Sequence, residues 1–202
     1  MSDWVDISVA DFEELAKADD KVSVLVGRLV IDRLPFTFES KEQYFTWRNI
    51  LASGLDVDDR DIVIVGSAAT GRSINPGKKF RIFHKKSDVD IAVISSVYFE
   101  RAWTWFRRTN PTLLGLNEEG LDLFDQHKKH YIFDGVIATN YFLSYLPFGS
   151  DWAKHLQISE AYLPRVLKGR QLNTRIYKDS EALRKDQERG LILYRRSLGI
   201  NN

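Results

Sequence analysis

The sequence predicts a mixed α/β (α+β) fold in which a small sheet is flanked by helices. Two short runs of β-branched residues, 62–65 and 89–94, are typical of buried strands. Longer segments around them have the apolar spacing of amphipathic helices. We expect one domain over residues 1–202, with a core at about 41–140 and a C-terminal helical extension at about 141–202.

The first part of the chain is expected to form two helices before the first strand. Residues 8–18 begin with a capping serine, Ser8, and carry acidic residues in the first turn, where the helix dipole favours them. Ser40 can cap a second helix at 41–53, whose aromatic and aliphatic residues share a broad face. A polar connection then leads to the strand at 62–65, which ends at Gly66.

The middle of the chain is expected to continue with helices. The second strand, 89–94, ends at two serines, and an aromatic helix at 98–108 follows it until Asn110-Pro111. Residues 117–129 fit a helix. Residues 131–138 fit either a strand or a continuation of that helix, and the sequence does not separate the two.

The last part contains a turn, a strand and two helices. Pro147-Phe148-Gly149 predicts the turn, and a helix begins over 151–156. Residues 174–177 fit a third strand. Asp179-Ser180 can cap a final helix that runs to about residue 198.

Composition excludes several classes of protein. Hydrophobic residues at 44% and charged residues at 28% exclude a disordered or low-complexity chain. The absence of cysteine excludes disulfides, thiolate zinc sites and cysteine nucleophiles. The N-terminal segment lacks a basic region followed by an apolar run, and no apolar run is long enough to span a membrane. We therefore expect a soluble, cytoplasmic protein without a membrane partner.

The charged residues are distributed unevenly. Residues 1–61 carry 14 acidic and 7 basic side chains, whereas residues 62–202 carry 14 acidic and 22 basic ones. Two stretches, Arg72–Lys86 and Arg165–Lys178, contain six and five Lys/Arg and no acid. Such clusters attract polyanions such as triphosphates, RNA or DNA, although solvated loops can have the same composition.

One segment, residues 61–96, places polar and acidic residues at the ends of the two strands. Gly66 and Ser67 follow the first strand, and Asp88 and Asp90 open the second. Side chains two residues apart on a strand point to the same face, so Asp88 and Asp90 present two carboxylates side by side. Adjacent carboxylates repel one another unless a hard divalent cation neutralises them, and Mg²⁺ is the usual partner where phosphates complete its shell.

This segment resembles a known superfamily. A Gly-Ser turn after one strand, followed by Asp-x-Asp at the next strand (here Ser87-Asp88-Val89-Asp90-Ile91), is similar to the DNA polymerase β-type nucleotidyltransferases. The resemblance covers residues 41–100 or so, and the rest of the chain is consistent with it. It implies a polymerase β-like core and Mg²⁺- or Mn²⁺-dependent transfer of a nucleoside monophosphate from an NTP to a hydroxyl group, with release of pyrophosphate.

The resemblance also assigns roles to individual residues. Asp88 and Asp90 would be catalytic and would hold the metal ion. Nucleotide binding would fall to the Gly-Ser turn and the basic loop after it, namely Gly66, Ser67, Arg72, Ser73, Lys78 and Arg81. The acceptor could be a nucleotide, RNA, DNA or a protein, and neither its identity nor the oligomeric state is indicated.

The spacer between Ser67 and Asp88 is longer and more basic than in compact bacterial members of the superfamily. Together with Val65-Gly66-Ser67-Ala68 before it and Phe99 and Trp103 after it, this spacer resembles a set of bacterial proteins associated with mobile elements and defence against phage. That resemblance names no substrate.

A third carboxylate, which the superfamily usually places on a later strand, has no certain counterpart. Asp134 is the best candidate if residues 131–136 are extended. If that region is helical, Asp134 is a surface or capping residue. Asp122 and Asp125 are further candidates, and the third strand supplies Asn173 and Arg175 but no acid.

Other readings of the sequence are weaker. A catalytically silent fold of this type, serving to bind nucleic acid or a protein partner, is the main alternative. His127 and His130 lack a third ligand, and the two lysines between them would repel a cation, so zinc is not expected. The Gly-x-Ser-x-Gly turn of serine hydrolases and the Gly-Lys-Ser/Thr of P-loops are both absent.

Overall fold

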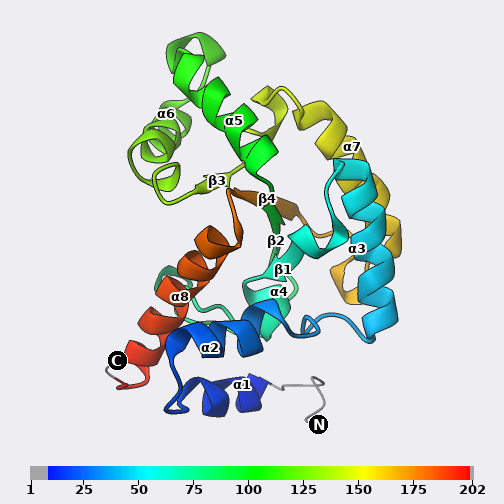
Figure 1. The fold of residues 1–202 in the computed structure, drawn as a ribbon, viewed down its shortest axis with the longest axis vertical. Helices are drawn as coiled ribbons and strands as arrows, with labels where there is room; N and C mark the ends of the chain where they lie inside the picture. The colour runs from blue at the N-terminus through cyan, green and yellow to red at the C-terminus, as the bar shows by residue number, and fades with distance from the viewer. Residues whose placement is uncertain (1–8, 201–202) are drawn as a thin grey trace.

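A four-stranded mixed sheet forms the centre of the structure, a computed structural model that describes residues 9–200 (Figure 1). Its strands are β1 Ile62–Val65, β2 Val89–Ile94, β3 Val136–Ala138 and β4 Leu172–Tyr177, in the order β1-β2-β4-β3. β2 is antiparallel to β1 and parallel to β4, and β3 is antiparallel to β4. The expected small mixed sheet with flanking helices is confirmed.

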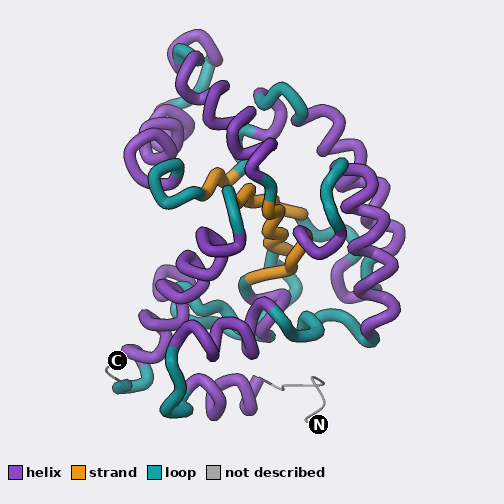
Figure 2. Tube along the Cα trace, viewed as in Figure 1, coloured by secondary structure: helices purple, strands orange, loops and turns teal. Residues whose placement is uncertain are grey.

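Helices surround this sheet (Figure 2). They are α1 Val9–Ala16, α2 Val22–Val26, α3 Lys41–Leu55, α4 Ser67–Thr70, α5 Ser96–Arg108, α6 Glu118–Gln126, α7 Gly149–Ser159 and α8 Ser180–Ser197. Two π-helical turns, Gly27–Ile31 and His127–Tyr131, continue α2 and α6. Among the helices within residues 9–200, none has both the length and the apolar character needed to cross a membrane.

Helix starts follow the expected capping. The Ser40 hydroxyl accepts a hydrogen bond from the Gln43 amide at 3.1 Å, and the Asp179 carboxylate accepts one from the Ala182 amide at 2.8 Å. Each bond satisfies a backbone donor that the helix itself leaves free. The cap expected at Ser8 lies outside the described residues.

Alternation along the strands produces two cores, one on each face of the sheet. Side chains on one face of the sheet, including Ile62, Ile64 and Ile91, pack with α3, α5 and α7. Side chains on the other face, including Val63, Val65 and Ala92, pack with α1, α2 and α8. The apolar core on this second face is interrupted by polar side chains, among them Asp90, which pairs with Val65. The site described below lies at this interruption.

The C-terminal part is more than a helical extension. β4 lies between β2 and β3, so the sheet extends well beyond a core ending near residue 140. Thr174 and Ile176 of β4 are buried, and the register of β4 with β2 gives β2 a second neighbour. Residues after 141 therefore supply an interior strand and the helix α8 that follows it.

The segment that the sequence left open, 131–138, divides into a turn and a strand. Only Val136–Ala138 is extended, and it is preceded by a π-helical turn and a hydrogen-bonded turn. His127 fastens this connection. Its Nδ1 lies 2.7 Å from the Leu123 carbonyl oxygen, and its Nε2 lies 3.0 Å from the Ala138 carbonyl oxygen and 3.2 Å from the Ala138 amide nitrogen. This buried imidazole therefore links α6 to β3.

Stability should fall in mildly acidic solution because of His127. Burial lowers the pKa of its imidazole below the usual 6.5, so the unfolded chain takes up a proton first as the pH decreases. We expect the urea midpoint to decline from about pH 6.5 downward, and His127→Gln to flatten that decline. Exposed His130→Gln should leave the decline as it is. Equal pH profiles for wild type and His127→Gln would contradict the assignment.

Candidate active site

A cavity of about 340 Å³ opens where β1, β2 and β4 meet α8. Four residues expected to bind nucleotide line it, namely Gly66, Ser67, Ser73 and Lys78, together with the expected catalytic residue Asp90. The opposite wall comes from the C-terminal part of the chain and consists chiefly of Arg175, Tyr177, Asp186, Gln187 and Arg189. The cavity therefore joins segments more than 80 residues apart in the sequence.

The Gly-Ser turn and the Asp-x-Asp strand are in direct contact. Val65 pairs with Asp90 in the β1–β2 register, and the next residue, Gly66, has φ +65°. A Cβ atom at Gly66 would lie 2.9 Å from the Asp90 Oδ2 atom. Glycine is needed here for both reasons, because its backbone turns left-handed and because the carboxylate occupies the space of a side chain. The two sequence motifs thus form one site.

The Asp90 carboxylate is held at an electrostatic cost. Burial raises its pKa, the charges of Arg175 and Lys78 counteract that rise, and Asp88 adds to it. Asn173, which pairs with Asp90 in the β2–β4 register, also forms a side-chain hydrogen bond to it. Asp88 and Asp90 are both half-buried. A carboxylate pair in this setting favours any added positive charge.

An arginine occupies the neighbouring strand. Arg175 on β4 faces the cavity, and its Nη1 atom lies 3.6 Å from Asp186 Oδ2. Although burial opposes its charge, the pKa of Arg175 is raised because Tyr177, Asp186 and Asp90 are nearby. Arg175 therefore lies between the carboxylates of Asp90 and Asp186 and interacts with both.

Asp186 is a carboxylate in this cavity that the sequence did not indicate. Its Oδ2 accepts a hydrogen bond from the Tyr177 hydroxyl at 2.7 Å, and its Oδ1 lies 3.8 Å from Arg189 Nη2. A helix rather than a strand presents it, which is why strand patterns miss it. One sequence feature could have indicated that α8 lines the site, namely Gly190, a glycine inside that helix. A Cβ there would lie 2.9 Å from Ile74 Cδ1, so α8 approaches the basic loop closely.

The remaining expected nucleotide-binding residues lie elsewhere. Arg72 donates to Glu13 at 3.0 Å and to the Tyr194 hydroxyl at 2.7 Å, and so ties the loop to α1 and α8. Arg81 is exposed and does not line the cavity. Asp88 lies just outside the lining, at the start of β2.

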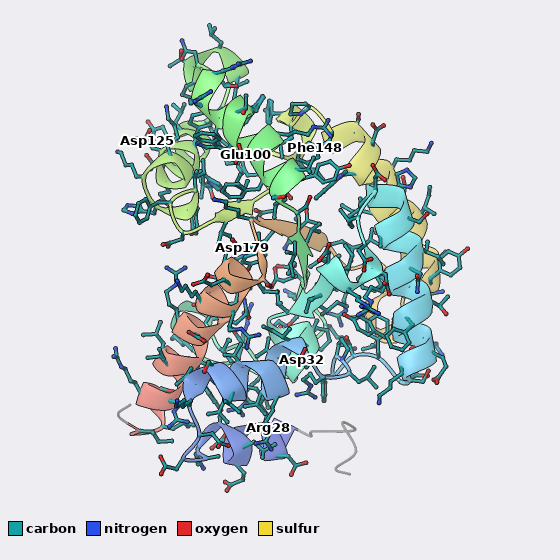
Figure 3. All side chains as sticks on the ribbon, in the orientation of Figure 1. Arg28, Asp32, Glu100, Asp125, Phe148 and Asp179 are labelled. Carbon is teal, nitrogen blue, oxygen red and sulfur yellow. The ribbon has the colours of Figure 1, made fainter. Side chains whose placement is uncertain are left out.

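The candidates for a third carboxylate are not brought to Asp90. The extended conformation considered for 131–136 is wrong for Asp134, which lies in the turn before β3 and pairs with Arg189 Nη1 at 2.5 Å. Asp134 lines a separate hollow beside α8 and not the cavity that contains Asp90. Asp122 and Asp125 are exposed on α6, and Asp125 lies far from the sheet (Figure 3).

The donor set determines which metal ion the site suits. Within residues 9–200 no three His, Cys, Asp or Glu side chains are grouped to hold a metal. Asp88 and Asp90 supply two carboxylates, and beside them Asn173 has a buried Oδ1 without a hydrogen-bond partner. One or two carboxylates with substrate phosphates form the usual protein site for Mg²⁺. The residues therefore fit a Mg²⁺ ion that arrives with a phosphate ligand.

Comparison of the chain with protein-family models, with curated proteins and with solved structures finds no match.

The contact between Gly66 and Asp90 can be measured by substitution. Gly66→Ala should destabilise the protein by more than the 1–2 kcal/mol or so that a left-handed residue costs, because its Cβ would meet the Asp90 carboxylate. Gly115→Ala, at φ +66° and ψ +25° with nothing within 4 Å, measures the cost of an ordinary left-handed residue, whereas Gly66 has ψ −151°, a conformation found almost only for glycine. In an Asp90→Ala background the cost of Gly66→Ala should fall while that of Gly115→Ala stays the same. An unchanged cost of Gly66→Ala in that background would contradict the contact.

Charge at Asp90 should oppose folding when no cation is bound. A raised pKa means that the folded state disfavours the ionised form, so stability falls as the pH rises from the ordinary carboxyl pKa of 3.8 to the raised value and stays lower above it. Asp90→Asn should therefore raise the melting temperature at neutral pH in chelator-treated buffer. A gain of about 1 kcal/mol would appear as roughly 2–4 °C in a chain of this size. A lower melting temperature would show that Arg175 and Lys78 outweigh burial.

Proposed function

We propose that this protein is a Mg²⁺-dependent nucleotidyltransferase of the DNA polymerase β type, which moves a nucleoside monophosphate from an NTP to a hydroxyl acceptor. The observation that carries the proposal is the packing of Gly66 against Asp90, because it brings the expected phosphate-binding turn and one of the two expected metal-binding carboxylates into one cavity. The expected role in phage defence rests on resemblance alone and stays a prediction.

The chain's own residues would bind the triphosphate on one side of the cavity. Ser67 is half-buried, lines the cavity, and its hydroxyl has no hydrogen-bond partner among residues 9–200. Lys78 supplies a positive charge from the basic loop, and Arg175 supplies another from β4. Preorganised cations of this kind stabilise the charge that develops on transferring phosphates.

The reaction forms a bond between the acceptor oxygen and the α-phosphorus and breaks the bond from that phosphorus to the bridging oxygen. Pyrophosphate leaves with the bonding electrons, and the hydroxyl proton is released to water. A Mg²⁺ ion at Asp88 and Asp90 would neutralise phosphate charge and acidify the acceptor hydroxyl. β2 holds Asp90 in place within the sheet, and Asp88 immediately precedes that strand.

A second candidate is a catalytically silent fold that binds a nucleotide or a partner. Arg175 favours it, because a permanent cation beside Asp90 partly replaces the charge of a metal ion. The part of the chain that the structure describes also brings no third acid within metal-binding reach of the pair. The two candidates differ in whether label is transferred.

Transfer can be tested with NTPs and dNTPs labelled on the α-phosphate, with Mg²⁺ or Mn²⁺ and total cellular RNA. Wild type should transfer label to a polymer, a small product or the protein and release pyrophosphate. Asp88→Asn/Asp90→Asn should lose at least about 100-fold of that rate, the scale on which electrostatic groups act in transition states. The measurement is the rate of label transfer, checked against the rate of pyrophosphate release.

A matched control removes two acids outside the cavity. Asp122→Asn/Asp125→Asn, on the exposed side of α6, should transfer label at the wild-type rate. No transfer by folded wild type, combined with NTP binding that Asp88→Asn/Asp90→Asn leaves intact, would reject the enzyme in favour of the silent fold.

A further inference from the structure

One arginine joins the two basic stretches that are separate in the sequence. The Arg170 Nη1 atom donates to the carbonyls of His84 and Ser87, each at 2.7 Å, and its Nε atom donates to the Val166 carbonyl at 2.6 Å. Its guanidinium also lies 4.6 Å from the centre of the Phe83 ring. The turn at 84–87 and the segment at 165–170 are therefore held side by side.

Four basic side chains project from these joined segments. Lys85 and Lys86 lie on the turn, and Arg165 and Lys168 on the other segment; we call these four residues the basic surface. All four are exposed. None of them forms an ion pair with an acid in the described part of the chain, whereas Arg72, Arg175 and Arg189 are each paired. Uncompensated, clustered cations of this kind attract a polyanion.

The basic surface lies directly beside the carboxylate pair. Ser87, whose carbonyl binds Arg170, immediately precedes Asp88 in the chain. The Val89 amide donates to the Gln171 carbonyl at 3.0 Å, so β2 and β4 begin pairing at the edge of this surface. None of the four residues lines the cavity, so Asp88 is the expected site residue that this surface adjoins.

We propose that the basic surface binds the phosphate backbone of a single nucleic-acid strand whose terminal hydroxyl is the acceptor. This inference rests on the proposed function and names its acceptor class. Binding would place phosphates on Lys85, Lys86, Arg165 and Lys168, with the strand end at Asp88. Arg170 is a positioning residue, because its donors are used by three carbonyl groups.

Exposed apolar side chains between the cations favour a nucleic-acid strand over a purely charged partner. Val166 is 50% exposed between Arg165 and Lys168, and Tyr162 is 45% exposed shortly before them. Bases of a single strand stack on exposed aromatic side chains, as Tyr162 is, while cations bind the backbone, and Val166 adds an apolar contact. An acidic peptide or a lipid headgroup layer offers no planar bases for these positions.

Fluorescence anisotropy with a labelled single strand tests the surface without requiring catalysis. Wild type should bind RNA or DNA strands of about 20 nucleotides, with an affinity that falls steeply between roughly 50 and 200 mM salt. Lys85→Ala/Lys86→Ala/Arg165→Ala/Lys168→Ala should bind at least about ten-fold more weakly, and its salt slope should shrink by roughly 0.7 for each lost phosphate contact.

Two further variants separate position from net charge. Arg108→Ala/Lys128→Ala/Lys154→Ala/Arg196→Ala removes the same charge from exposed sites on other elements and should retain wild-type affinity. Arg170→Lys keeps the charge but cannot reach three carbonyl groups, so it should weaken binding in protein whose circular dichroism is unchanged. Equal losses in both quadruple variants, or unchanged binding by Arg170→Lys, would overturn the assignment.

Other polyanions supply the remaining comparison. Polyglutamate, or vesicles of phosphatidylcholine and phosphatidylserine, should bind more weakly than either strand; equal binding would overturn nucleic acid as the partner. Mg²⁺-NTP binding, measured on the same samples, keeps the two proposals apart. Strand binding without NTP binding rejects the proposed function alone, and NTP binding without strand binding rejects this inference alone.

Discussion

The charge on Asp90 is the constraint around which the rest of the structure is arranged. A half-buried carboxylate next to another acid disfavours ionisation, so the fold surrounds it with compensating groups from three parts of the chain. Gly66 gives it room, Lys78 approaches from the basic loop, and Arg175 approaches from β4. Each of these depends on the sheet, because strand register determines which side chains face the cavity.

The positive charge that compensates Asp90 is also shared with a second acid. Arg175 is shared between Asp90 and Asp186, and Asp186 is in turn held by Tyr177 and Arg189. Arg175 thus neutralises Asp90 only in part. A bound cation or phosphate can change how strongly Arg175 interacts with each of the two acids.

Local patterns predict the half of the site that lies close together in sequence. β-branched runs at 62–65 and 89–94, with Gly66-Ser67 and Asp88/Asp90 at their ends, are short-range signals, and the contact between Gly66 and Asp90 follows from them. The wall from Arg175 to Arg189 depends on β4 entering beside β2 and on α8 crossing the same face. No local spacing encodes that pairing, so Asp186 was missed and Asp134 was considered in its place.

The position of β4 has a consequence for synthesis of the chain on the ribosome. β3 is made some 35 residues before β4, yet β4 is its hydrogen-bonding neighbour in the sheet. Until residue 177 emerges, β2 and β3 each have an unpaired edge, and Asp90 lacks Arg175. Non-local pairing of this kind is slow and leaves strand edges exposed. Nascent chains would therefore carry an incomplete, charged pocket until β4 has been made.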